Sequence, residues 1–451
     1  MLMLVDGLVL RQLSYLSLPF FNSLNCAVEV YLHLDSYHKN SIMKLDSNFV
    51  RSQFPAFKEP SLEGWSFFEN AGGSYACQHV IDRLMEFYTK TKVQPYYSFP
   101  ASITGGEKMD ESYRRIAEYL NVGEDEINFG PSTSQNVYVL ANALRPMWED
   151  GDQIIVSCQN HEANAGAWHR LEQRGIVVTE WHIDETSGQL SVGELDKLIT
   201  PRTKMIAFPH SSNVIAHVNP VKEIAQKAHD AGAITVVDAV SYAPHGFSDI
   251  KDLGADIYLF SLYKTWGPHL GLMFVKKELQ KQMANQSHFF NKDDDRCNLT
   301  PAGPDHAQIA SAAGIADYFD AVHDHHFEKT DSVNVKRQRL FELFEEHEKE
   351  LLTPLLDFLK SRDDVKIIGP DDPNIRCATV TFLPLKKDFN EVVDTLAKEN
   401  LMVGVGDFYG VRPLNEMKID LDPGAIRLSF LHYNTMEEIE HLIAGLKVAL
   451  G

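Results

Sequence analysis

Short runs of apolar and β-branched residues recur along the first two thirds of the chain, and some of them end on a polar residue. The run from Ile234 to Val237 ends at Asp238, and the run from Ile257 to Phe260 ends at Ser261. Runs of this length predict strands that are buried on both faces. The strands that we expect here are 153–157, 176–181, 204–208, 234–238, 257–261 and 271–275.

Helical periodicity separates these strands. Apolar residues recur at helical spacing in residues 80–88, 108–120 and 192–198. Strands that alternate with helices in this way predict an α/β architecture with a mostly parallel sheet.

The last third of the chain has a different pattern. Residues 319–359 are strongly helical and rich in Glu and Lys, which predicts a connection into a second domain. Strands near 365–368 and 376–382, with a final helix at 437–450, predict a small α+β unit. The length of 451 residues supports two domains, because a single core stops growing below this size.

The first 42 residues fit neither domain. The run from Gln12 to Val28 carries no charge, but Ser, Asn and Pro interrupt it and it is too short for a secure membrane span. Only Arg11 precedes it and no cleavage site of small residues follows, so we expect no signal peptide. We therefore expect residues 1–42 to be a poorly ordered extension, with Met43 as an alternative start of the protein.

Charge and cysteine content narrow the class of protein. The 42 basic and 63 acidic residues give a net charge of −21 without a dense basic cluster, which argues against nucleic acid and anionic membranes as partners. The five cysteines are scattered and form no CxxC pair, which favours a reducing compartment, the cytoplasm, over a disulfide framework or a zinc site. The tract from His323 to His326 could chelate a metal, but we expect it to form a solvated helix face.

Asp238 and Lys264 form the candidate catalytic pair. Both follow predicted strands, and the carboxyl ends of neighbouring parallel strands face one ligand site. A desolvated lysine is a good nucleophile for an aldehyde, and a buried carboxylate can keep a pyridine nitrogen protonated. These are the two fixed requirements of pyridoxal 5′-phosphate (PLP) chemistry. Spacing alone leaves open a surface lysine and an ordinary strand-end aspartate.

The runs VVDAVSYAPH and DIYLFSLYKTWGPHLGLMFV resemble the cofactor-binding core of the class V aminotransferase family of PLP-dependent enzymes, especially its cysteine desulfurase and selenocysteine lyase branch. Matching segments extend from FFENAGGS at Phe67 to RLSFLHYNT at Arg427. The resemblance implies the aspartate aminotransferase-like fold (fold type I) with a mostly parallel seven-stranded sheet. It implies a large PLP-binding domain at residues 43–320, which includes an amino-terminal segment at 43–75, and a small α+β domain at 321–451.

The resemblance also implies the roles of site residues. Asp238 would hold the pyridine nitrogen, Lys264 would bind the cofactor aldehyde and remove the substrate α-proton, and His161 would stack on the ring. Other cofactor-binding positions implied by the resemblance are Ser132, Thr133, Ser134, Asn213, Ser241, Ser261 and Tyr263. Hydroxyl groups at a helix start suit a phosphate, although ordinary helix capping would explain residues 132–134 as well.

The substrate side follows from the same resemblance. Arg427 matches the arginine that holds the α-carboxylate of an amino acid, and the turn at Asn70 matches a segment that borders the substrate. Arg412 could read a second acidic group, or pair with Asp407 or Glu416. The family's homodimer with shared active sites implies that Thr300 or Gly303 contacts the cofactor phosphate of the partner subunit.

Three positions depart from the family pattern. Ser241 replaces a glutamine that contacts the phenolic oxygen, and Tyr263 replaces a histidine that binds the phosphate. The mobile loop that carries the sulfur-accepting cysteine of desulfurases corresponds to residues 403–412, which contain no cysteine. Without that thiolate the loop cannot form a persulfide. We therefore expect a β-eliminating C–S lyase, with an epimerase, a transaminase or a noncatalytic PLP-binding protein as alternatives.

Overall fold

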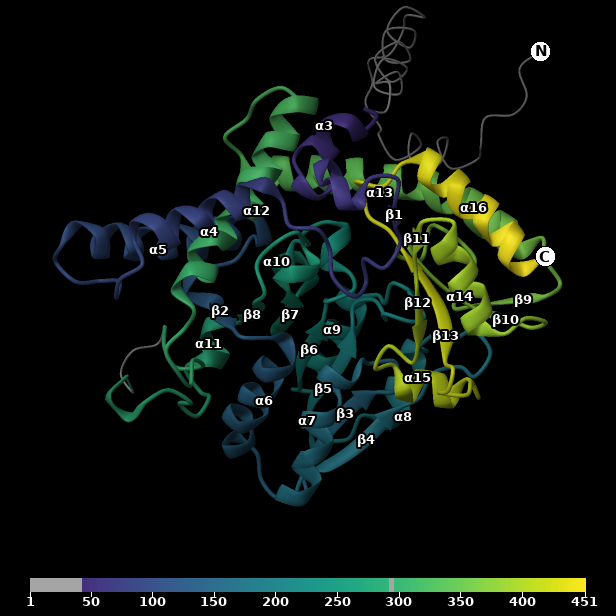
Figure 1. Cartoon of the computed structure of the whole chain (residues 1–451). Helices are drawn as coiled ribbons and strands as arrows, with labels where there is room; N and C mark the ends of the chain where they lie inside the picture. The colour runs from purple at the N-terminus through teal and green to yellow at the C-terminus, as the bar shows by residue number, and fades with distance from the viewer. Residues whose placement is uncertain (1–42, 292–295) are drawn as a thin grey trace, which may run out of the picture. The chain divides into compact units, whose positions relative to one another are not determined.

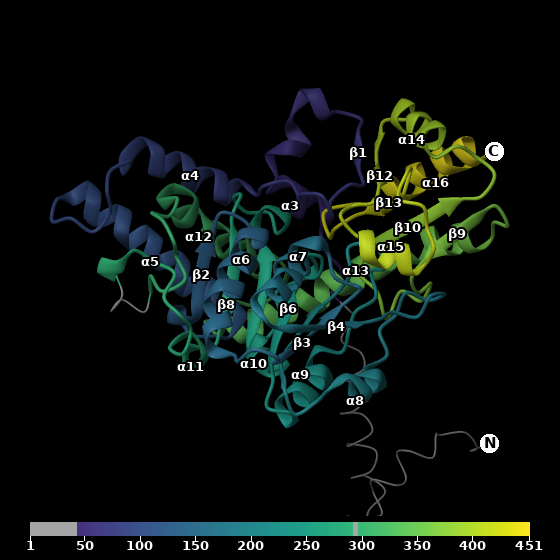
Figure 2. The same ribbon diagram turned by 90° about the horizontal axis from the view of Figure 1, so that it is seen from below.

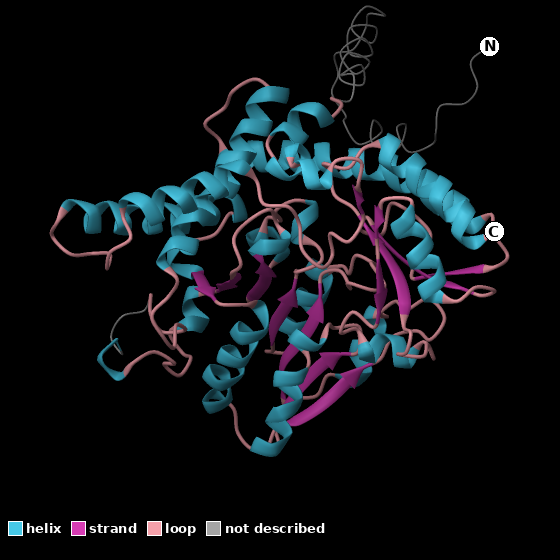
Figure 3. Cartoon of the chain, in the orientation of Figure 1, coloured by secondary structure: helices cyan, strands magenta, loops and turns pink. Residues whose placement is uncertain are grey.

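The computed structural model describes residues 43–291 and 296–451, in which residues 45–451 form one compact unit. The predicted extension at residues 1–42 lies outside the described residues. Among the described helices, none is long and apolar enough to cross a bilayer. Strands lie at the centre of the unit and helices cover them (Figure 3).

A seven-stranded sheet forms the centre of the larger part (Figure 1). Its order is β2-β8-β7-β6-β5-β3-β4, and all neighbours are parallel except those of β8, which runs antiparallel to β2 and β7. The strands are β2 (Ile127–Gly130), β3 (Gln153–Ser157), β4 (Val177–Trp181), β5 (Thr203–Pro209), β6 (Ile234–Asp238), β7 (Ile257–Ser261) and β8 (Gly271–Val275). The predicted mostly parallel sheet is therefore confirmed.

Alternate residues of these strands enter two separate hydrophobic cores, as the two-residue period of a strand requires. In β7, Tyr258 and Phe260 join the core that also contains residues of α5 (Pro100–Leu120), α9 (Val221–Asp230) and α12 (His306–His326). Ile257 and Leu259 of the same strand join the core that contains residues of α6 (Thr133–Leu144) and α7 (Gly166–His169). Helices thus cover both faces of the sheet.

A short strand and several helices precede the larger sheet in the chain. The short helix α3 (Ser47–Ser52) and the helix α4 (Gln78–Lys90) flank β1 (Ser66–Phe67). The strand β1 does not join the large sheet but pairs in parallel with β11 (Leu401–Met402) near the carboxyl terminus. This pairing places the turn that follows β1 beside the carboxyl-terminal elements.

A four-stranded antiparallel sheet of order β12-β13-β10-β9 forms the smaller part, to the right of the larger sheet in Figures 1 and 2. Its strands are β9 (Val365–Ile368), β10 (Thr379–Pro384), β12 (Gly404–Gly406) and β13 (Ala425–Ser429). The helices α13 (Val333–Lys360), α14 (Phe389–Lys398) and α16 (Met436–Leu450) pack around it on a third core. This is the small α+β unit expected from the sequence, although the boundary at residue 320 stays a prediction.

Residues 319–359 are mostly helical as expected and belong to two helices, since α12 ends at His326 and α13 begins at Val333 after a polar segment. One expectation for this region is wrong. The histidine tract is not a solvated face, since His323 is fully buried and His326 is 8% exposed. The backbone N–H of Asp46 donates to Nε2 of His326 at 2.8 Å, so the tract docks the segment around α3.

Candidate functional site

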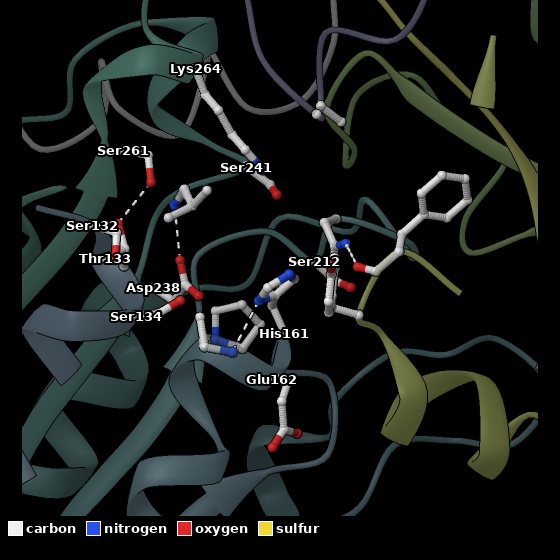
Figure 4. Close-up of a pocket in the computed structure, with 18 of the residues that line it drawn as sticks. Ser132, Thr133, Ser134, His161, Glu162, Ser212, Asp238, Ser241, Ser261 and Lys264 are labelled. Carbon is white, nitrogen blue, oxygen red and sulfur yellow. Dashed lines mark hydrogen bonds between the residues drawn. The ribbon is translucent and has the colours of Figure 1, made fainter. Parts of the chain in front are cut away.

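A cavity of about 670 Å³ opens at the carboxyl ends of β5, β6 and β7. Figure 4 shows side chains from the strand ends and from the start of α6 pointing into one space. The predicted site residues that line it are Ser132, Thr133, Ser134, His161, Asn213, Asp238, Ser241, Ser261, Tyr263, Lys264 and Arg427. Asn70 and Arg412 do not line it.

Lys264 lies three residues beyond the end of β7 and reaches toward Ser241 (Figure 4). Its side chain is buried at 9% exposure. Burial and the positive charge of Arg427 lower the pKa of the ammonium to about 8. About one fifth of the amine is therefore neutral near physiological pH, far more than for a solvated lysine, and the neutral form is the one that a nucleophile or a base requires.

Asp238 ends β6, and its Oδ1 accepts a hydrogen bond from the backbone N–H of Val240 at 2.9 Å. Burial raises the pKa of its carboxyl group to about 6. A carboxylate this deeply buried gains from a cationic partner. A protonated ring nitrogen would be such a partner.

The amino terminus of α6 borders the cavity beside Asp238 (Figure 4). The first turn of a helix leaves its backbone N–H groups without intrahelical partners, which favours an anion there. The hydroxyl groups of Thr133 and Ser261 lie 2.8 Å apart and add side-chain donors. Gly271 allows this approach of β8 to the helix start, because a Cβ there would lie 2.5 Å from the backbone nitrogen of Thr133.

His161 follows β3 and lies at the centre of the cavity lining (Figure 4). Its Nδ1 accepts a hydrogen bond from the backbone N–H of Ala163 at 3.0 Å. Burial and the charge of Lys264 lower the pKa of the imidazole to about 4. His161 is therefore neutral at physiological pH, and its ring proton lies on Nε2.

Arg427 lies on β13 of the smaller sheet and reaches the same cavity. Its guanidinium forms an ion pair with Glu69 and stacks on the ring of Phe408 at 3.9 Å from the ring centroid. Its Nη1 donates to the carbonyl of Asn213 at 3.4 Å, while its Nε is buried without a partner. An unpaired donor on a buried arginine fits a substrate carboxylate.

Two predicted substrate contacts lie elsewhere. The amide of Asn70 donates to the carbonyls of Phe67 and Ser429, and its oxygen accepts from the hydroxyl of Tyr433. Asn70 thus fastens the turn that follows β1. Its role in substrate binding stays a prediction.

Arg412 pairs with Glu162 and lies 3.7 Å from Glu180. Asp407 and Glu416 were the alternative partners expected from the sequence, and the role of Arg412 in reading an acidic group of the substrate stays a prediction. The nearby Glu416 instead pairs with His182. Cys158, Glu180 and His182 approach one another at this place, a cluster of side chains that ligate metals in other proteins. The sequence offered no spacing that would have revealed it.

The positions that depart from the family pattern also have defined surroundings. Tyr263 lines the cavity and stacks on His269, with ring centroids 4.5 Å apart. Ser241 lines the cavity near the end of Lys264 (Figure 4). Thr300 and Gly303 line a different cavity of about 410 Å³, which also contacts the start of α6 through Gln135 and Asn136.

The residues present fit PLP. The helix start and hydroxyl groups suit its phosphate, Asp238 suits its ring nitrogen, and Lys264 suits its aldehyde. The buried Oδ1 of Asn213 has no partner and lines the same cavity, so a polar ligand group is expected beside it. The cavity volume leaves room for a substrate next to the cofactor.

Comparison with known proteins agrees with the fit of PLP to this site. The family model described as "Aminotransferase class-V" matches residues 66–442. The aminotransferase-like protein FGM3 of Gibberella zeae is 32% identical over 414 residues, which cover 89% of this chain and 98% of that protein. The cysteine desulfurase-like protein ustD of Aspergillus flavus is 28% identical over 444 residues, which cover 94% of this chain and 93% of that protein.

The fold also has solved counterparts. A cysteine desulfurase from Thermococcus onnurineus, solved in its apo form, superposes with a TM-score of 0.77 at 22% identity. That likeness covers 90% of this chain and 98% of the other chain. The fold predicted from the sequence is confirmed.

Two acidic residues that line the cavity, Glu69 and Glu162, were not predicted from the sequence. Each lies next to a predicted site segment, but its partner is distant in the chain: Arg427 for Glu69 and Arg412 for Glu162. An acid beside the turn at residues 70–73 was the only available signal for Glu69.

Proposed function

Because the chain belongs to the class-V aminotransferase family and is a PLP-dependent enzyme, we propose that it catalyses β-elimination from a sulfur-containing amino acid. The proposed substrates are cysteine, selenocysteine and S-substituted cysteines or their sulfoxides. The products are a 2-oxo acid, ammonia and the leaving group, with consumption of one water; the leaving group is hydrogen sulfide from cysteine, hydrogen selenide from selenocysteine, a thiol from an S-substituted cysteine and a sulfenic acid from a sulfoxide.

One observation carries this proposal. The cavity brings together a buried lysine of lowered pKa, Lys264, and a carboxylate-binding arginine, Arg427, while its described lining residues include no cysteine. The loop at residues 403–412 contributes Phe408 and Tyr409 to that lining. A sulfur atom that leaves Cβ therefore meets aromatic side chains there instead of an accepting thiolate.

Each residue of the site has its own role in the proposed reaction. Arg427 holds the α-carboxylate through its fork of donors, and the neutral fraction of Lys264 removes the α-proton. Asp238 keeps the ring nitrogen protonated. PLP, when bound, supplies the electron sink that makes the α-hydrogen acidic enough to remove. The neutral His161 holds one face of the site and offers Nε2–H as a hydrogen-bond donor.

An alternative function uses the same first proton transfer. A transaminase would retain the amino group on the cofactor, and an epimerase would return a proton to Cα. The name of the Gibberella zeae relative, an aminotransferase-like protein, favours the transaminase among these two. A noncatalytic PLP-binding protein would not need an unpaired buried Nε on Arg427, so we rank it last.

The test is to incubate the PLP-loaded protein with L-cysteine and S-substituted cysteines and to assay pyruvate, alanine and sulfide together. Pyruvate that appears with sulfide in equal amounts supports β-elimination. Alanine with sulfide would mean that another thiol accepts sulfur, and would overturn the proposal. Turnover that depends on an added 2-oxo acid would establish the transaminase, and solvent deuterium at Cα without ketoacid release would establish the epimerase.

The assembly and the compartment also belong to this proposal. We propose a cytoplasmic homodimer in which Thr300 or Gly303 of one chain approaches the phosphate in the partner subunit. The position of both residues in a cavity that reaches the start of α6 supports this, since that helix start is the proposed phosphate site. Light scattering after size exclusion would give the mass, and a monomer that turns over substrate would contradict the shared site.

A further inference from the structure

A second cavity, of about 100 Å³, lies apart from the main one, between α13 and the segment that leads into β10. Four of the polar or nucleophilic side chains that line it are buried, namely His245, Glu348, Arg376 and Cys377. No step of the proposed reaction uses any of them.

Two charged residues in this cavity each have an atom without a partner. Glu348 is 5% exposed and Arg376 is 6% exposed. Oε1 of Glu348 accepts no hydrogen bond, and Nε of Arg376 donates none. A buried polar atom without a partner is destabilising, so a ligand that supplies the partner is favoured. An anion and a cation with unused hydrogen-bonding capacity thus line one small cavity, which suits a small zwitterion.

Cys377 lies beside His245, whose imidazole is kept protonated by the groups around it. Nδ1 of His245 lies 2.6 Å from Oε2 of Glu348. Burial of His245 is outweighed by the charge of Glu348 and by Cys377, which together raise the pKa of the imidazole well above its usual value. Tyr242, Glu345 and Lys349 line the rest of the cavity. Cys377 thus has a positively charged neighbour in a partly open cavity, the kind of surroundings in which reactive cysteines are found.

Cys377 differs from the other buried cysteines because the cavity that it lines opens to solvent. The exposed Asn374 lines the same cavity, so its mouth reaches solvent. Cys77 and Cys158 are buried outside this cavity, and burial raises the pKa of the Cys77 thiol to about 12. These two thiols serve as internal references for reactivity.

We propose that Cys377 is a modification site that exchanges with the disulfide of a small amino acid such as cystine. The thiolate of Cys377 attacks one sulfur, so a new S–S bond forms as the old one breaks. Cys377 is oxidised, and the other half of the disulfide leaves as a reduced thiolate that takes a proton from water. The attached half lies in the cavity with its carboxylate at Nε of Arg376 and its ammonium at Oε1 of Glu348.

Modification there would act on the main cavity through the backbone. The N–H of Cys377 donates to the carbonyl of Ala216 at 3.0 Å, and the N–H of Val218 donates to the carbonyl of Ile375 at 3.0 Å. The segment at residues 375–377 is thus bonded to the loop that carries Asn213. An added group at Cys377 would strain these two backbone hydrogen bonds. The strain would shift the loop that carries Asn213.

The test compares three disulfides on the PLP-loaded protein at neutral pH: cystine, bis(2-hydroxyethyl) disulfide and glutathione disulfide. Peptide mass spectrometry would follow each cysteine separately. We expect Cys377 to react at least tenfold faster than Cys77 and Cys158, in the order cystine, then the hydroxyethyl compound, then glutathione disulfide. The charged cavity favours the first over the second, and its small volume excludes the third.

Variants of the cavity residues test whether the reactivity of Cys377 comes from these side chains or from solvent exposure alone. Glu348→Gln should slow cystine exchange at Cys377 about tenfold, because it removes both the ammonium site and the partner of His245. Lys349→Ala, at the same cavity, should leave the rate unchanged. If the Gln variant fails to fold, the comparison of cystine with the hydroxyethyl disulfide on the unaltered protein decides, since only cystine carries the charges that Glu348 and Arg376 can pair. Equal rates for the three disulfides, or no adduct at Cys377, would overturn the proposal.

Discussion

The guanidinium of Arg427 forms its ion pair with the carboxylate of Glu69 inside the cavity that contains Lys264. Arg427 is 3% exposed and Glu69 is 29% exposed, measured on their side chains. The chain leaves space for this acid, because a Cβ at Gly72 would lie 2.0 Å from Oε2 of Glu69. A substrate carboxylate that approaches Arg427 therefore competes with a carboxylate of the protein.

Replacing Glu69 by Gln should strengthen substrate binding. The substitution keeps the shape and removes the competing charge, so we expect KM to fall about three- to tenfold, with a smaller change in kcat. Loss of the partner of a buried arginine should also cost about 1 kcal/mol of unfolding free energy. Steady-state kinetics and thermal unfolding measure the two effects. Glu162→Gln is the matched control, since Glu162 lines the same cavity but pairs with Arg412; a raised KM in the Glu69 variant would contradict competition.

Replacing Lys264 by Ala should abolish turnover. The lysine is the proposed base and the group that binds the cofactor aldehyde, so we expect activity to fall at least 10⁴-fold, on the order that removal of a catalytic group produces. The product assay and the amount of PLP retained through gel filtration are the measurements. Lys251→Ala, an exposed lysine outside the cavity lining, should behave as the unaltered enzyme. Retained turnover in the Lys264 variant would overturn the assignment of the base.

Replacing Asp238 by Asn should stabilise the cofactor-free protein at pH 8 and weaken PLP binding. The folded state raises the pKa of this carboxyl from 3.8 to about 6, so it binds the proton more tightly than the unfolded chain does. Stability is then highest below pH 4 and falls as the pH rises through 6, by about 3 kcal/mol for this group. Asparagine does not ionise, so the variant does not lose this free energy of unfolding. Unfolding of the cofactor-free unaltered protein and of the Asp238→Asn variant at pH 4 and pH 8 would measure the difference.

Asp256→Asn is the control for this effect. Asp256 is also buried, but hydrogen bonds from Lys276 and His229 outweigh its burial and lower the pKa of its carboxyl group. The same substitution there should destabilise the protein at pH 8 and matter less in acid. Destabilisation of the cofactor-free Asp238→Asn protein at pH 8 would show that Asp238 is stabilised as an anion without PLP.

The rate at which the cofactor-free protein binds PLP should rise with pH and level off above about 8. Only the neutral amine of Lys264 attacks an aldehyde, and burial together with Arg427 lowers its pKa to about 8. Stopped-flow absorbance at several pH values gives the midpoint. Arg427→Gln removes a positive neighbour, so the midpoint should move to higher pH; a midpoint near 10.5 in the unaltered protein would mean that the lysine is solvated.

Local patterns were enough to predict most of the larger sheet. The buried strands at residues 153–157, 234–238 and 271–275 have the predicted bounds, because an apolar run that ends in a polar residue or a turn marks both ends. The helical region predicted at 319–359 is interrupted at residues 327–332. Thr330, Asp331 and Ser332 favour turns and helix caps, and Ser332 is the N-cap residue of α13.

The site was predictable where one segment carries the chemistry, and hidden where two distant segments meet. Asp238 and Lys264 lie at strand ends in one stretch, so topology alone brings them together. The pairs formed by Glu69 with Arg427 and by Glu162 with Arg412 join residues 358 and 250 positions apart. No spacing rule covers such contacts. The same holds for the histidine tract, whose burial depends on the docking of α3.

The two groups that must act on one substrate molecule belong to different sheets. Lys264 follows β7 of the seven-stranded sheet, whereas Arg427 lies on β13 of the four-stranded sheet. The distance from the carboxylate anchor to the base is therefore a property of the whole unit, set by how the sheets pack. A substitution far from the cavity that tilts one sheet against the other would move the α-hydrogen relative to the amine, and so could change which bond at Cα or Cβ breaks without touching a catalytic side chain.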